Sequence, residues 1–309
     1  MSPPLVSVII PTYRRAAFLA ETLESVVAQT FTDYEVIVVE DGSHDAPDAL
    51  LPYGDRITYL WQPNQGVGVA RNTGAAKARG RWLAFLDDDD LWAPEKLERQ
   101  LEAAAANPSA GLLHTDHLKL VDRDVRVPPR NPPRERVPSG WVCKELVLFS
   151  NFIVASSTLV RRTEFERVGG FTTNREWAED FELWLRLSRV CEIQFVPSPL
   201  TIYRDHAGSL SGELRWHFCH LNALEHFVRT DPSIWQECGA VTLRRCINGV
   251  CWRGGYDHLM QEQFAGARQL FYAAWRWMPW DARSALYAVV SLAGSSGFRF
   301  ARAVKRGLT

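Results

Sequence analysis

The sequence predicts an α/β protein with a parallel sheet in its first 120 residues and a helical region in its last third. Short apolar runs alternate with segments of helical periodicity over residues 1–120, the pattern of strands joined by crossover helices that cover both faces of the sheet. From Glu213 onward the pattern is almost entirely helical. Hydrophobic residues make up 46% and charged residues 23% of the 309, which is typical of a globular protein and excludes a disordered chain.

Four apolar runs rich in β-branched or aromatic residues are expected to be buried strands. They are Val6–Ile10, Val36–Val39, Ile57–Trp61 and Trp82–Leu86. Further signals predict a helix near 142–149, a strand near 153–160, a helix from about Ala178 and a strand at 193–196. Because ligands bind at the carboxyl ends of parallel strands, the polar residues that follow the first four strands form the candidate site.

Two later segments have their own character. Residues 122–138 contain five prolines and several arginines, and are expected to form a mobile surface loop or lid. After residue 213, helices are expected near 235–252, 258–277 and 281–304, separated by Gly254-Gly255 and Pro279.

Charge and cysteine content exclude several classes. The 35 Lys and Arg balance 36 Asp and Glu, so no global field attracts nucleic acid and no nucleic-acid partner is expected. The six cysteines form no CxxC pair, which disfavours a structural zinc site and favours a reducing compartment. Neither a signal peptide nor a transmembrane segment is expected, because the uncharged run 284–298 is shorter than the roughly 20 residues that span a bilayer. We therefore expect a cytoplasmic protein.

Four consecutive aspartates, Asp87–Asp90, follow the fourth predicted strand and are the most informative feature of the chain. Their mutual repulsion is costly unless a cation intervenes. Mg²⁺ and Mn²⁺ bind oxygen ligands and often bridge carboxylates to a diphosphate. The alternative is an acidic loop that only ends a strand.

Other turns narrow the class of ligand. Asp41, after the second strand, can accept hydrogen bonds from a ribose or a base edge, or can belong to an ordinary Asp-Gly turn. The turn after the first strand, residues 11–15, contains no glycine. A dinucleotide fingerprint is therefore missing, and both an NAD-linked oxidoreductase and a sugar nucleotidyltransferase are disfavoured.

Taken together, seven motifs resemble those of family 2 glycosyltransferases of the GT-A fold. They are Val6–Tyr13, Asp41–Ser43, Asn64–Gly74, Leu86–Asp90, Val168–Phe171, Glu179–Arg186 and Tyr203–Ser209. The resemblance covers about residues 5–212 and implies a mixed nucleotide-binding sheet flanked by helices. It divides the chain into a donor-binding half (1–120), an acceptor and catalytic half (121–212) and a helical C-terminal extension (213–309). The implied activity is inverting transfer of a hexosyl or related group from a nucleotide-diphosphate donor to an acceptor hydroxyl.

The resemblance also implies roles for individual residues. The D-x-D pair Asp87 and Asp89 and the later His206 match metal ligands for Mn²⁺ or Mg²⁺, whereas Asp88 and Asp90 support the site or face solvent. The alternative for His206 is a polar surface residue, and the alternative for Arg71 is a charged residue on a helix surface. The positions matched to donor binding are Pro11, Thr12, Tyr13, Asp41, Asn64, Arg71, Asp87, Asp88 and Arg204.

Inversion requires a base that takes the proton of the acceptor hydroxyl. Asp180 is the candidate, because the pair Glu179-Asp180 begins a helix with an apolar stripe that anchors it over the sheet. Glu179 is the alternate base. The non-catalytic alternative for Asp180 is an acid that caps the N-terminus of the helix. Trp177 is expected to stack on an acceptor sugar, with plain packing as its alternative.

The leading hypothesis is a metal-dependent glycosyltransferase that acts in polysaccharide or glycolipid biosynthesis on a glycan or lipid-linked acceptor. A non-catalytic nucleotide-sugar or glycan-binding module on the same fold is the alternative, and a metal-dependent phosphodiester hydrolase is a weaker one. Residues 213–309 either pack as a helical appendage or dock on the inner face of the membrane. The docking alternative is based on the five bases and one acid of residues 281–309, on the uncharged run 284–298 and on Trp275, Trp277 and Trp280, which precede that run.

Overall fold

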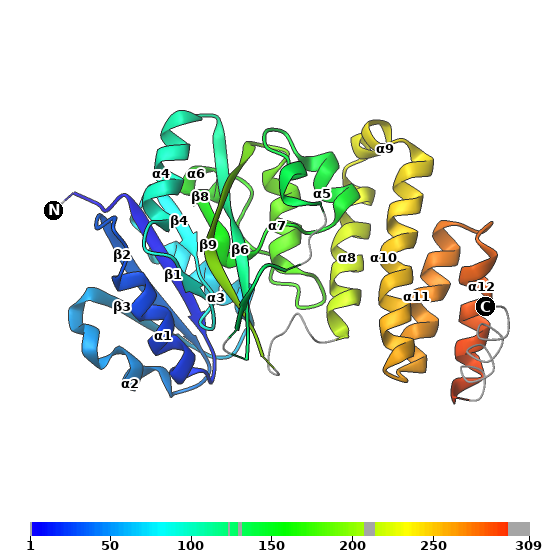
Figure 1. Cartoon of the computed structure of the whole chain (residues 1–309), viewed down its shortest axis with the longest axis horizontal. Coiled ribbons are helices and arrows are strands. Elements are labelled where there is room, and N and C mark those ends of the chain that lie inside the picture. The colour runs from blue at the N-terminus through cyan, green and yellow to red at the C-terminus, as the bar shows by residue number, and fades with distance from the viewer. Residues whose placement is uncertain (1, 123, 129–131, 207–213, 296–309) are drawn as a thin grey trace. The chain divides into compact units, whose positions relative to one another are not determined.

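The computed structural model of the chain describes residues 2–122, 124–128, 132–206 and 214–295 (Figure 1). It contains two compact units. The first comprises residues up to 175 together with 179–207, and the second comprises residues 176–178 and those after 207.

The first unit is a single sheet with helices around it. Its described strands are β1 Val6–Thr12, β2 Tyr34–Asp41, β3 Ile57–Gln62, β4 Trp82–Phe85, β5 Leu91–Trp92, β6 Ala110–Val121, β7 Asp124–Arg126, β8 Thr158–Arg161 and β9 Glu192–Asp205. Its described α-helices are α1 Ala16–Val27, α2 Ala46–Leu50, α3 Val67–Lys77, α4 Lys96–Ala106, α5 Cys143–Phe149, α6 Arg162–Arg167 and α7 Glu179–Leu187. Short 3-10 helices cover Leu51–Arg56, Arg134–Arg136 and Ala155–Ser157.

The sheet is mixed, with the strand order β3-β2-β1-β4-β8-β6-β9-β5 and β7 paired to β6. Strands β1 to β4 are parallel to one another. β8 is antiparallel to both β4 and β6, whereas β9 runs parallel to β6. The four strands predicted in the first 120 residues and their parallel arrangement are confirmed, and so is the mixed sheet implied by the family resemblance.

Both faces of the parallel part carry a helix. Val8 and Ile10 point from β1 into a core that also holds Leu19 and Leu23 of α1. Ile9 points to the opposite face because side chains alternate along a strand. There Gly74 lets α3 lie close, since a Cβ at this position would be only 2.6 Å from Ile9 Cγ2.

Several predicted boundaries in the middle of the chain differ from the structure. The strand expected near 153–160 is shorter, because residues 155–157 form a 3-10 turn before β8 begins at Thr158. The strand expected at 193–196 is part of the longer β9, which continues because it pairs along β6. Within 122–138, the described part contains β7, which forms a hairpin with β6, and a 3-10 turn at Arg134–Arg136.

The second unit is helical as predicted, with α8 Arg215–Thr230, α9 Ser233–Cys238, α10 Ala240–Met260, α11 Phe264–Trp277 and α12 Ala282–Leu292. The predicted break at Gly254-Gly255 is wrong, because both glycines lie inside α10. A Cβ at Gly254 would be 2.8 Å from His217 Cβ, and one at Gly255 would be 2.9 Å from the Phe271 ring. These glycines therefore permit close helix packing rather than end a helix.

Within the described residues, no helix is both long and apolar enough to cross a bilayer. The predicted helix 281–304 is described as α12 up to Leu292, and its part after residue 295 lies outside the described residues.

Candidate functional site

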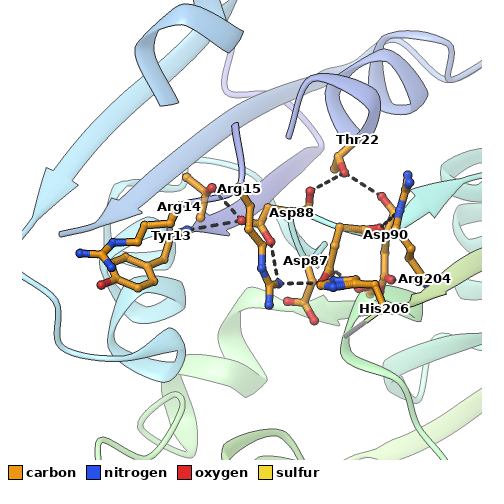
Figure 2. A network of polar contacts seen from close by, with 12 residues as sticks. Tyr13, Arg14, Arg15, Thr22, Asp87, Asp88, Asp90, Arg204 and His206 are labelled. Atoms are coloured by element: carbon orange, nitrogen blue, oxygen red, sulfur yellow. Dashed lines mark hydrogen bonds and ion pairs between the residues drawn. The ribbon is translucent and has the colours of Figure 1, made fainter. Parts of the chain in front are cut away.

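The polar residues that follow β1, β2 and β4 lie at one edge of the sheet because these strands are parallel. The acidic turn, residues 87–90, lies between β4 and β5. Figure 2 shows Tyr13, Arg15, Thr22, Arg204 and His206 around this turn.

Asp88 fastens the acidic turn to the end of β1. Its Oδ2 accepts a hydrogen bond from Thr12 Oγ1 at 2.7 Å and another from the Tyr13 backbone N–H at 3.3 Å. Burial raises the pKa of Asp88 to about 7, against the opposing effect of the Thr12 hydrogen bond. The alternative that Asp88 faces solvent is wrong, because the residue is buried.

Asp90 is also buried, so the solvent-facing alternative is wrong for this residue too. Its Oδ1 accepts from the Arg204 backbone N–H at 2.9 Å, which joins the acidic turn to β9. Oδ2 has no hydrogen-bond partner within the described part of the chain. Burial raises the pKa of Asp90 well above its usual range, and the charges of Asp89 and Asp87 add to the rise. Asp90 is thus a supporting carboxyl behind the site.

Asp89 carries the contacts that bear on a metal ion. Its Oδ2 lies 2.9 Å from His206 Nε2 and 2.6 Å from Arg15 Nη1. Asp89 and His206 are 117 positions apart in the sequence, and the end of β9 at Asp205 brings His206 to the turn. Among the described residues, no three His, Cys, Asp or Glu side chains are grouped closely enough to hold a metal ion.

The donor set nevertheless fits a divalent cation shared with a ligand. One carboxylate oxygen and one imidazole nitrogen suit Mn²⁺, and a protein that supplies few ligands leaves coordination positions for diphosphate oxygens and water. Arg15 currently balances the carboxylates, since its guanidinium lies within 3.2 Å of Asp88 and 2.6 Å of Asp89.

Arg71 connects the acidic turn to the start of α7. Its guanidinium pairs with Asp87 at 2.5 Å and with Glu179 at 2.8 Å, and lies 5.1 Å from the centroid of the Phe171 ring. The side chain is only 3% exposed. The alternative that Arg71 is a helix-surface charge is therefore wrong.

Asp180 lies in the first turn of α7, beside Glu179. Its Oδ2 accepts from Asn151 Nδ2 at 3.0 Å, and its Oδ1 accepts from the Phe181 backbone N–H at 2.6 Å. Burial raises the pKa of Asp180 to about 7, and the Glu179 charge adds to the rise while Arg71 opposes it. A carboxyl with a pKa near 7 is suited to act as a base at neutral pH.

Asp41 holds the loop before α3. Its carboxylate accepts hydrogen bonds from Gln62 Nε2 at 2.7 Å and from the backbone N–H groups of Gln65 and Gly66, both at 2.8 Å. Gly66 has a φ of 94°, which favours glycine at this position. Asp41 therefore shapes this end of the site whether or not it also contacts a nucleoside.

The remaining predicted residues have clear positions. Pro11 is the last residue but one of the buried β1, and Tyr13 is exposed beside Arg14. The carbonyl and Oδ1 of Asn64 accept hydrogen bonds from Arg175.

Two residues have protein partners where a ligand was expected. Arg204 donates to Glu21 Oε2 at 2.6 Å and to the Asp89 carbonyl at 2.8 Å. Trp177 belongs to the second unit, where its ring centroid lies 4.2 Å from that of His226. Phosphate binding by Arg204 and acceptor stacking by Trp177 stay predictions.

Two functional candidates were missed by sequence reasoning. Arg15 carries a weak signal, since a base directly follows the first strand's turn in a site rich in acids. Asn151 carries none, because its contact with Asp180 spans 29 residues and depends on the loop after α5.

The chain is similar to known proteins that share one family name. The sequence model of the family Glycosyl transferase family 2 matches residues 7–140. A protein of Rickettsia prowazekii named uncharacterized glycosyltransferase RP339 is 30% identical over 226 residues, which cover 72% of this chain and 69% of that protein. The chain spans 64% and 33% of the length of relatives from Rickettsia typhi and Rickettsia bellii.

Two solved structures have a similar fold. TarS 1–349 of S. aureus in complex with UDP-GlcNAc has a TM-score of 0.64 at 15% identity, covering 89% of this chain and 82% of that one. Mannosyltransferase PcManGT of Pyrobaculum calidifontis, in complex with GDP-Man and Mn²⁺, has a TM-score of 0.58 at 19% identity, covering 95% and 87%. At these identities the likeness establishes the GT-A fold alone.

Proposed function

Because the chain belongs to the family 2 glycosyltransferases, we propose that it transfers a sugar from a nucleotide-diphosphate donor to an acceptor hydroxyl with inversion, using Mn²⁺ or Mg²⁺. One observation carries this proposal. Asp180 has a pKa raised to about 7 and lies next to Glu179 in the chain. The buried Arg71 pairs with Glu179 and with Asp87 of the acidic turn.

Asp180 acts as the general base. The raised pKa lets the Asp180 carboxylate take up the acceptor hydroxyl's proton near neutral pH as the new glycosidic bond forms. The bond between the anomeric carbon and the diphosphate breaks at the same time, and the diphosphate leaves with the electron pair. Asn151 and the Phe181 N–H fix one hydrogen bond on each carboxylate oxygen, so the group is oriented before the acceptor binds.

Asp89 and His206 would hold the cation at the diphosphate end, and Asp87 lies on the same turn. When bound, the ion supplies charge stabilisation to the departing diphosphate. Arg15 and Arg71 keep the carboxylates of the turn in place, which limits the reorganisation needed when the donor binds. The complexes of TarS with UDP-GlcNAc and of PcManGT with GDP-Man and Mn²⁺ support this assignment.

The nucleoside is proposed to lie against Pro11, Thr12 and Tyr13, near Asp41 and Asn64. Each carboxylate oxygen of Asp41 can accept more than one hydrogen bond, so a ribose hydroxyl can bind in addition to the loop amides. The acceptor is proposed to be a glycan or lipid-linked hydroxyl. Trp177 and Arg204 remain candidates for acceptor and phosphate contacts.

A test separates the enzyme from a non-catalytic binding module. The purified chain is incubated with a panel of nucleotide-sugars, with Mn²⁺ or with a chelator, and release of nucleoside diphosphate is measured. We expect slow, metal-dependent release from one or a few donors. Donors that raise the melting temperature with Mn²⁺ but are never turned over, even with added glycan acceptors, would favour the binding module.

A further inference from the structure

Arg15 and His206 share one carboxylate oxygen of the acidic turn. Arg15 Nη1 lies 2.6 Å from Asp89 Oδ2, and His206 Nε2 lies 2.9 Å from the same atom. A carboxylate oxygen accepts about two hydrogen bonds, so these two contacts use its capacity. A cation can therefore bind to this oxygen only if one of the two partners changes its contact.

The two partners differ in what they can do beside a metal ion. A neutral imidazole nitrogen can itself become a ligand, so His206 can stay at Asp89 when a divalent ion binds there. A guanidinium has only N–H donors and a permanent positive charge. Arg15 repels a divalent ion at Asp89, whichever carboxylate oxygen the ion uses. Of the two groups, Arg15 is therefore the one that a cation displaces.

The surroundings of Arg15 allow its side chain to move. It is 25% exposed, whereas the side chain of Arg71 is 3% exposed and pairs with two carboxylates. The acidic turn has other anchors, because Asp88 accepts hydrogen bonds from Thr12 Oγ1 and the Tyr13 backbone N–H. The carboxylates can thus keep their positions while the guanidinium leaves.

We propose that Arg15 changes partners when the cation and the donor bind, and that its guanidinium leaves Asp89 to pair with the donor's diphosphate. The diphosphate arrives with the cation and carries negative charge, and arginine binds phosphate oxygens through two N–H groups at once. Arg15 then balances the carboxylates before donor binding and the leaving group after it. The proposal rests on the metal-dependent transfer proposed above.

This exchange predicts how the ligands bind. Mn²⁺ alone competes with Arg15, and no phosphate is present to receive the guanidinium, so the ion should bind weakly. Mn²⁺ and a nucleoside diphosphate should strengthen each other's binding, and Arg15 should account for part of that coupling.

The test is titration of the full chain with Mn²⁺, followed by electron paramagnetic resonance, with and without UDP or GDP, whichever the wild type binds. Arg15→Gln should bind Mn²⁺ alone about tenfold more tightly than the wild type, because a like charge has left the site. With saturating Mn²⁺ it should bind the nucleotide about tenfold more weakly, because a phosphate partner is missing. A misfolded variant would lose both affinities rather than gain one.

Arg14→Gln is the matched control, because it removes the same charge from the neighbouring residue. The Arg14 guanidinium lies 5.0 Å from the centroid of the Tyr13 ring (Figure 2). This variant should bind Mn²⁺ alone much as the wild type does. Arg15→Lys keeps the positive charge and should also retain the weak Mn²⁺ binding of the wild type.

Each negative result contradicts a different statement. Equal Mn²⁺ affinity of Arg15→Gln and the wild type overturns the competition, and so does an equal gain in Arg14→Gln. Unchanged nucleotide affinity of Arg15→Gln overturns the contact with the diphosphate. A wild type that binds no Mn²⁺, with or without nucleotide, contradicts the metal dependence of the proposed function and overturns the role of Arg15 with it.

Discussion

Arg71→Met removes a buried side chain that joins the acidic turn to the start of α7. The substitution keeps most of the apolar volume but leaves the carboxylates of Asp87 and Glu179 without their cation. Breaking a buried ion pair costs about 3–5 kcal/mol. Because these carboxylates are 29% and 25% exposed, water solvates part of their charge, and we expect a loss of about 2–3 kcal/mol.

Two measurements report the effect of Arg71→Met. The melting temperature should fall by roughly 4–12 °C, given about 2–4 °C per kcal/mol for a protein of this size. The pH–rate profile of donor turnover should also move. Arg71 opposes the rise in the pKa of Asp180, so without it the pKa lies above about 7 and activity appears only at higher pH.

Arg79→Met is the matched control. Arg79 pairs with Glu35 at 2.7 Å, but its side chain is 66% exposed, and exposed pairs contribute about 0–1 kcal/mol. Its melting temperature and pH profile should stay close to those of the wild type. If Arg71→Met loses no more stability than Arg79→Met and keeps its pH profile, the argument that Arg71 organises the site is refuted.

Three further predictions use other parts of the first unit. Asp89→Ala should weaken Mn²⁺-dependent binding of a nucleoside diphosphate, and His206→Ala should do so more mildly; unchanged affinity of both in calorimetry contradicts the metal assignment. Wild-type donor turnover should rise with pH with a midpoint near 7, and Asn151→Ala should move that midpoint upward, because its hydrogen bond favours the ionised Asp180; an unmoved midpoint argues against this role. Burial lowers the pKa of Lys96, so the unfolded state binds more protons and the free energy of unfolding of the wild type should rise as the pH rises towards 10. Lys96→Met should remove that rise and stabilise the fold by about 1 kcal/mol at neutral pH. Urea unfolding of Lys96→Met with the same pH dependence as the wild type would rule this out.

The parallel half of the sheet could be predicted from the sequence because each strand is a short apolar run with a local signal. Val6–Thr12 is buried over its whole length, and so is its neighbour β4, while β2 is buried from Val36 to Asp41. The placement of β8 between β4 and β6 could not be predicted, because antiparallel pairing of distant segments leaves no local pattern.

Residue roles in the site were predictable only where a motif carried them. The resemblance put Asp89 and His206 in one site, and their side chains lie 2.9 Å apart. Nothing in the sequence indicated that Asp88 would bind Thr12 and the end of β1, because the burial of each aspartate depends on how β5 and β9 close the turn. Asn151 was missed because its contact with Asp180 depends on the loop after α5.

The two glycines of α10 show why helix ends cannot be predicted reliably from glycine content alone. Two adjacent glycines weaken a helix by propensity, which is why a break was predicted. Here the missing side chains allow His217 and Phe271 to approach the α10 backbone, so tertiary packing outweighs the local cost. Only the partners of α10 distinguish these two cases.

The most direct test of the account compares Asp180→Asn with Glu179→Gln. Both changes remove one carboxylate from the same helix turn and keep its shape. Turnover with a donor identified from the panel is measured together with donor affinity by calorimetry. We expect Asp180→Asn to keep donor affinity and lose about 10²–10⁴ in turnover, the usual worth of a general base, while Glu179→Gln loses clearly less. Near-normal turnover of Asp180→Asn, or a larger loss in Glu179→Gln, contradicts the assignment of Asp180 as the base.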